Sequence, residues 1–130
     1  MDADTGFVKL LKHWAVDDCG RVINPMLVDE QMRGALFEEC LDDTDGTLKN
    51  GNMADCLVPM AAEIPDIVVS HVQSPTHSSM LDAKGAGEAG TAGAPGAVMN
   101  AINDALAPFG VRVSSQPITP EKILRALGKV

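Results

Sequence analysis

Apolar and strand-forming residues gather in separate stretches of the chain that predict β-strands. Residues 7–16 alternate imperfectly between apolar and polar positions but are rich in residues that favour strands, and a turn at residues 4–6 precedes them. Residues 67–72 form a mostly apolar run rich in β-branched side chains. A shorter strand is predicted at residues 111–114. These segments would supply a small sheet.

Other stretches carry apolar residues at helical spacing. The first helix is predicted to begin at Pro25, because proline is tolerated at the first helical position, and to run to about Cys40. A second is predicted to open at Pro95, no earlier, and to end at residues 108–110. The last is predicted to begin at Thr119. Their inward stripes are Val28, Met32, Ala35, Leu36 and Cys40; Val98, Met99, Ile102, Ala105 and Leu106; and Ile123, Leu124 and Leu127.

The order of these segments predicts the fold class. Strands mixed with about three helices, without a regular strand–helix alternation, indicate an α+β fold with a small mixed or antiparallel sheet. A chain of 130 residues is long enough to bury one hydrophobic core. We therefore expect residues 1–130 to form a single domain.

Charge and cysteine content narrow the classes of partner and site. The net charge of −8, without any basic cluster, argues against nucleic acid and anionic membrane surfaces as partners. Neither a signal peptide nor an apolar run of about 18 residues is seen, which favours a cytoplasmic location. Cys19, Cys40 and Cys56 are widely spaced and odd in number, so we expect reduced thiols and no disulfide framework. No histidine has a metal-ligand partner at suitable spacing, so no protein-held metal site is predicted.

Candidate chemistry concentrates in a glycine-rich stretch at residues 83–95. Its glycines allow backbone N–H groups to approach a ligand closely, and Glu88 is the one carboxylate among them. The spacing alone leaves two readings equally open, a functional loop and a flexible surface loop with a solvated glutamate. Gly85, Gly87 and Gly90 also match the dinucleotide fingerprint. That fingerprint requires a preceding strand, its third glycine inside a helix and an acid about 20 residues later, and we expect all three to be missing.

Several motifs resemble one known family. Residues 83–88, 93–98 and 100–106 resemble the C-terminal signature of the molybdenum hydroxylases, which include xanthine dehydrogenase, aldehyde oxidase and the large subunit of carbon monoxide dehydrogenase. Residues 15–25 resemble the motif that precedes it, so the similarity covers nearly the whole chain. The resemblance implies the last subdomain of a molybdopterin-binding region. It also implies that Glu88 is the catalytic base and that Lys84, Gly85, Ala86 and Gly87 contact the molybdenum cofactor.

The chain also departs from that family. Between Gly34 and Ala35 the relatives carry further helical turns, including a glutamine that contacts the cofactor, and the chain is far shorter than their catalytic subunit. We therefore expect a truncated, catalytically incomplete domain that binds no cofactor alone. The alternatives are a small non-catalytic binding or assembly protein that retains the fold, and one part of a split oxidoreductase whose partner subunit supplies the rest. The sequence names no substrate.

Self-association is a further expectation. The strand at residues 7–16 begins near the start of the sequence, so the hairpin partner that its relatives have is missing and one strand edge would be unpaired. Pairing across a two-fold axis would satisfy that edge, which predicts a homodimer or a larger even-numbered assembly.

Overall fold

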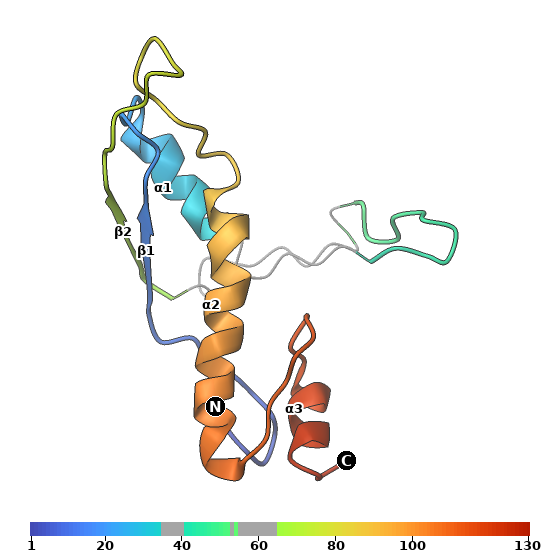
Figure 1. Cartoon of the computed structure of the whole chain (residues 1–130). Coiled ribbons are helices and arrows are strands. Elements are labelled where there is room, and N and C mark those ends of the chain that lie inside the picture. The colour runs from blue at the N-terminus through green and yellow to red at the C-terminus, as the bar shows by residue number, and fades with distance from the viewer. Residues whose placement is uncertain (35–40, 53, 55–64) are drawn as a thin grey trace. The chain divides into compact units, whose positions relative to one another are not determined.

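The computed structural model describes residues 1–34, 41–52, 54 and 65–130, and it divides the chain into two compact units. The first unit combines Met1–Leu10 with Pro95–Val130, and the second comprises Leu11–Ala94. Each unit has its own arrangement of helices or strands (Figure 1). The single domain expected from the sequence remains a prediction.

The second unit contains a two-stranded parallel sheet and one helix. Strand β1 (His13–Asp17) pairs in register with β2 (Ile67–His71), so that His13 faces Ile67 and Asp17 faces His71. Helix α1 (Pro25–Gly34) lies between them in sequence (Figure 1). The α+β class is confirmed, but the described strands pair in parallel and not in the mixed or antiparallel sheet that was expected. A long crossover joins them, and parallel strands require such a connection.

The two faces of this sheet differ in exposure. Ile67 is buried and its neighbours on the same face are partly buried, whereas Trp14, Val16 and Val68 on the opposite face are exposed. Helix α1 belongs to the covered side, since Asp29 Oδ1 lies 2.9 Å from His71 Nε2. The period-two alternation therefore leaves an apolar face uncovered by the described residues of this unit.

The ends of these elements refine the sequence predictions. Helix α1 begins at Pro25 as predicted, and the part expected at residues 35–40 lies outside the described residues. The strand predicted at residues 7–16 was too long, because β1 begins only at His13. Its partner β2 has five residues, so pairing is available to five residues of β1 only.

The first unit is built around a compact apolar core. Helix α2 (Ala89–Leu106) belongs to this unit from Pro95 on and continues into a short 3₁₀ helix (Ala107–Phe109), and helix α3 (Pro120–Ala126) follows (Figure 1). The buried members of the core are Ile102, Leu106, Val113 and Ile123. Partly buried residues pack against them: Val8, Val98, Val111, Ile118, Ala126 and Leu127. The stripes predicted for the last two helices therefore supply three of the four buried members, Ile102, Leu106 and Ile123.

Helix α2 begins earlier than the sequence suggested. Its first residue is Ala89, so Pro95 lies inside the helix and the prediction of a start at Pro95 was wrong. A proline inside a helix removes one N–H donor and crowds the preceding turn. The alanines around it have the highest helix propensity of any residue, which offsets part of that cost.

Two further segments show how side chains set local structure. The strand predicted at residues 111–114 is absent. Instead, the Asn103 side chain accepts a hydrogen bond from the Val113 N–H at 2.8 Å and donates one to the Val113 carbonyl at 2.9 Å, taking the place of a partner strand. Helix α3 begins as predicted, because Thr119 Oγ1 accepts from the Lys122 N–H at 3.3 Å.

Removing the largest buried side chain should destabilise the first unit. Leu106 is fully buried, so Leu106→Ala should lower the free energy of unfolding by about 2–5 kcal/mol through lost burial and a residual cavity. Chemical denaturation followed by circular dichroism measures the change. Leu11→Ala is the matched control, because Leu11 is exposed and its truncation leaves no cavity. Equal effects of the two substitutions would contradict the assignment of the core.

Candidate functional site

The chain that leads to Glu88 is attached by its backbone to the segment that follows β1. Gly20 and Ala83 form an antiparallel bridge, the Lys84 N–H donates to the Cys19 carbonyl at 2.8 Å, and the Arg21 N–H donates to the Asp82 carbonyl at 2.9 Å. Gly20 has φ +64°, and a Cβ there would lie 2.3 Å from the Asp82 oxygen. Only glycine allows this close approach.

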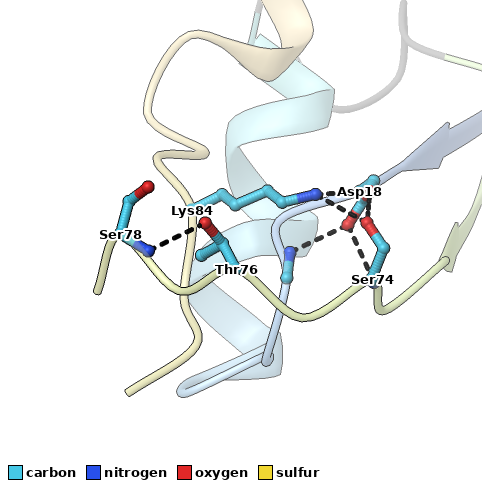
Figure 2. A network of polar contacts seen from close by, with 6 residues as sticks. Asp18, Ser74, Thr76, Ser78 and Lys84 are labelled. Atoms are coloured by element: carbon cyan, nitrogen blue, oxygen red, sulfur yellow. Dashed lines mark hydrogen bonds and ion pairs between the residues drawn. The ribbon is translucent and has the colours of Figure 1, made fainter. Parts of the chain in front are cut away.

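A side-chain network reinforces the same attachment. The Asp18 carboxylate accepts hydrogen bonds from the Gly20 N–H at 3.0 Å, the Ser74 N–H at 3.2 Å, the Ser74 hydroxyl and Lys84 Nζ at 2.7 Å. Lys84 Nζ also donates to Ser74 Oγ at 2.6 Å. Figure 2 shows the Lys84 side chain extended toward Asp18 and Ser74. We call Asp18, Ser74 and Lys84 the clamp.

The clamp perturbs the titration of its carboxylate. The hydrogen bond from Lys84 is the largest cause, followed by those from Ser74 and the Gly20 N–H, and together they hold the pKa of Asp18 well below its usual range. Each donor stabilises the ionised form. The carboxylate therefore stays charged and bound to the ammonium under ordinary conditions.

Beyond Lys84 the chain is open. A Cβ added at Gly85 or at Gly87 would meet no atom of the described residues within 4 Å, so the backbone at both positions is uncovered. Glu88 is exposed and lies in the turn immediately before α2. Its carbonyl accepts from the Ala92 N–H at 3.1 Å and from Thr91 Oγ1 at 2.9 Å, which makes Glu88 the first residue bonded into the helix. A negative charge is favourable at a helix N-terminus.

The structure brings most of the predicted site residues together in one short segment. The stretch between the clamp and α2 comprises Gly85, Ala86, Gly87 and Glu88, and we call it the open segment. Lys84, predicted to contact a cofactor, has its ammonium on Asp18 and Ser74. A role of these residues in binding a cofactor remains a prediction.

One of the three features expected to be missing from the dinucleotide fingerprint is present in the structure. Because α2 begins at Ala89, Gly90 does lie inside a helix, contrary to the expectation from sequence. The required preceding strand is still missing, since Ser79 to Asp82 form a tight turn in which the Asp82 N–H donates to the Ser79 carbonyl at 3.2 Å. The segment therefore lacks the strand-to-helix geometry of a dinucleotide site.

Other polar groups of the described residues lack the geometry of an alternative site. Ser74 next to Lys84 resembles a nucleophile beside a base, but an ammonium that donates to Asp18 is not poised to accept a proton. A hollow of about 440 Å³ lies in the first unit beside Asn103 and Asp104, and the Asn103 amide is already bonded to Val113. Within the described ranges, no three His, Cys, Asp or Glu side chains are grouped to hold a metal ion.

The sequence analysis missed two groups of residues. The clamp joins residues 18, 74 and 84, and the pair His71–Asp29 joins β2 to α1 across 42 positions. Neither has a local periodicity that reveals it. The run of two aspartates before Cys19-Gly20, which forms part of the family motif, was the one available signal for Asp18.

Two further observations concern thiols and membranes. Cys19 is a buried free thiol, as expected, and Cys40 and Cys56 lie outside the described residues. In the portion of the chain that the structure covers, no helix is both long and apolar enough to cross a bilayer.

Comparisons with known proteins point in one direction. Residues 1–65 match the family described as molybdopterin cofactor-binding domain. The chain is 40% identical to the nicotine 6-hydroxylase large subunit of Paenarthrobacter nicotinovorans, over 97% of this chain and 16% of that protein. It is 34% identical to the carbon monoxide dehydrogenase large chain of Afipia carboxidovorans, over 82% of this chain and 14% of that one.

A solved structure agrees with these matches. Quinoline 2-oxidoreductase from Pseudomonas putida 86 superposes with a TM-score of 0.83 and 38% identity, over 99% of this chain and 17% of that chain. The chain thus spans about a sixth of the length of the proteins that it matches. The nicotine hydroxylase and the carbon monoxide dehydrogenase relatives are named as a large subunit and a large chain, which indicates that each assembles with other subunits.

The lowered pKa of Asp18 gives a pH dependence with a definite sign. Its ionised form is favoured by folding, so this stabilisation is complete above the unfolded-state pKa of about 4 and is lost as the pH falls toward the folded value. Carbon-13 NMR should find the Asp18 carboxyl still ionised at a pH of about 3.

Lys84→Met should raise the pKa of Asp18 toward its usual range by removing the strongest donor. Lys49→Met is the matched control, because it breaks the separate Lys49–Asp43 ion pair. A titration midpoint for Asp18 near the ordinary aspartate value in the unmodified chain would disprove the role of the network.

Proposed function

The chain belongs to the molybdenum hydroxylase family and corresponds to part of its molybdopterin-binding domain; on this premise we propose that it supplies the catalytic base, Glu88. The single observation that carries the proposal is the position of Glu88, exposed at the end of an open glycine segment and directly before α2. A base must be within reach of the proton that it accepts. An exposed carboxylate beside glycines whose added Cβ would meet no described atom within 4 Å meets that requirement.

The residues of this segment are suited to holding a molybdopterin-type cofactor. Adding a Cβ at Gly85 or Gly87 would fill open space, so the backbone there is accessible to a ligand. Gly85, Ala86 and Gly87 would present backbone groups to the cofactor, which when bound supplies the redox chemistry. The Glu88 carboxylate would accept the proton that the nucleophile releases as it attacks the substrate.

We further propose that these residues form one part of a larger catalytic site. The chain spans 16% of the first relative's length, and catalysis requires positioned groups from several segments. The remaining groups would come from further polypeptide or from a separate oxidoreductase subunit. A non-catalytic binding or assembly protein is the alternative. No substrate is assigned, and the cytoplasmic location remains a prediction.

A chimera tests the role of Glu88. Replacing the matching segment of the nicotine 6-hydroxylase large subunit by this chain, with that protein's own extra residues kept between the positions of Gly34 and Ala35, should give an enzyme that retains molybdenum and hydroxylates nicotine. Glu88→Gln should then lower kcat by about 100-fold or more with an unchanged molybdenum content, because the amide cannot accept the proton. Turnover assays and metal analysis provide the two measurements.

Glu121→Gln is the matched control, since Glu121 is an exposed carboxylate on α3 that pairs with Arg125. Equal turnover in Glu88→Gln and the unmodified chimera would refute the assignment of the base. A chimera that binds molybdenum but never turns over would favour the non-catalytic alternative. The isolated chain should contain no stoichiometric molybdenum, and turnover by it alone would contradict the proposal of incompleteness.

We also propose that the isolated chain forms a homodimer or a larger even-numbered assembly. The support is the exposed apolar face of the sheet made by Trp14, Val16 and Val68. Exposed apolar faces of this kind mark interaction surfaces. A second copy of the same face would cover it across a two-fold axis.

Light scattering at micromolar concentration should therefore report at least twice the chain mass. Trp14→Ser should shift the mass toward the monomer because it removes the largest apolar side chain of the face. Phe109→Ser, which removes an exposed aromatic residue of the other unit, should leave the mass unchanged. A monomer mass for the unmodified chain would rule out self-association.

A further inference from the structure

We propose that Asp18, Ser74 and Lys84 are positioning residues that fix the start of the open segment and thereby hold Glu88 in place. The inference rests on the proposed function, because the carboxylate being positioned is the catalytic base. It assigns Lys84 to the internal clamp and not to direct contact with a cofactor.

Lys84 anchors the near end of the open segment to the two strands. The Lys84 N–H is bonded to the Cys19 carbonyl, and its side chain is bonded to Asp18 and Ser74. Asp18 directly follows β1, and Ser74 lies shortly after β2. Lys84 is therefore anchored to the ends of both strands of the sheet.

Helix α2 holds the far end of the open segment. Glu88 is bonded through its carbonyl to Ala92 and Thr91 at the start of α2. The segment between these anchors includes Gly85 and Gly87, where an added Cβ would meet no atom of the described residues within 4 Å. Glycine has more backbone freedom than any other residue. Fixing both ends of so short a segment removes much of that freedom, and releasing one end restores it.

Binding of the Lys84 ammonium to an external ligand would break its hydrogen bonds within the clamp. Its ammonium donates to a carboxylate and to a hydroxyl that is itself bonded to the same carboxylate. Charge-assisted hydrogen bonds of this type are the strong ones. Moving the ammonium to an external ligand would leave Asp18 without its cation and Ser74 without that donor. The ion pair therefore favours retention of Lys84 in the clamp.

Nitrogen-15 relaxation NMR on the full chain tests the clamp without any cofactor. Asp18→Asn and Lys84→Met should lower the order parameters of the Gly85, Gly87 and Glu88 amides from about 0.8 to about 0.6 or below. Ser74→Ala should cause a smaller fall in the same direction, since the Lys84–Asp18 bond remains. The Lys84 ammonium signal should also broaden in Asp18→Asn.

Two controls separate positioning from general structure. Lys84→Arg should restore most of the lost order, because a guanidinium also donates to a carboxylate. Lys49→Met should leave the open segment unchanged although it breaks another ion pair of the same unit. The amides of β2, such as those of Ile67 and Val69, report whether the second unit of each variant is folded. If Asp18→Asn unfolds the chain, Ser74→Ala and Lys84→Arg still decide the outcome.

Unchanged order at Glu88 in the clamp variants would overturn the inference, and so would an equal loss of order in Lys49→Met or no rescue by Lys84→Arg. The readout is independent of the proposed function. Loss of order at Glu88, together with full turnover of the Glu88→Gln chimera, would support the clamp and refute the base. The opposite pair of results would support the base and refute the clamp.

Discussion

The parallel pairing of β1 with β2 is the constraint on which the candidate site depends. In register, this pairing places Asp17 beside His71, and the Val72 N–H continues it by donating to the Asp17 carbonyl at 2.8 Å. The residues that follow the two strands therefore emerge together, and the Asp18 carboxylate reaches the Ser74 N–H and hydroxyl. An antiparallel sheet would have separated these two strand ends.

Two carboxylates near this point have opposite environments. Asp18 is surrounded by donors that lower its pKa, so it serves as a fixed negative charge at a partly exposed position. Glu88 has an exposed side chain and a backbone bonded into α2. A carboxylate that is fully occupied by donors can anchor structure, whereas one that is open to solvent can exchange protons with a ligand. The second unit therefore contains both a carboxylate suited to anchoring the chain and a carboxylate suited to proton exchange.

The sequence predicted the elements with strong local signals and missed those with long-range causes. Pro25, the first residue of α1, and the threonine cap of α3 located both starts correctly, because such signals act over one turn. Pro95 misled the prediction for α2, because the helix continues on both sides of it. The direction of strand pairing could not be derived, since it depends on how a long connection folds back.

The same reasoning applies to the candidate site. Glu88 was found because glycines beside a lone acid form a local pattern and because that pattern resembles a family motif. The clamp could not be found this way, since the side chains of Asp18, Ser74 and Lys84 meet only after the sheet has formed. A motif therefore points to the group that we propose as the base, and the fold points to the groups that we propose as positioning residues. Resemblance alone would assign Lys84 to the cofactor, whereas its ion pair with Asp18 favours a role in holding the chain.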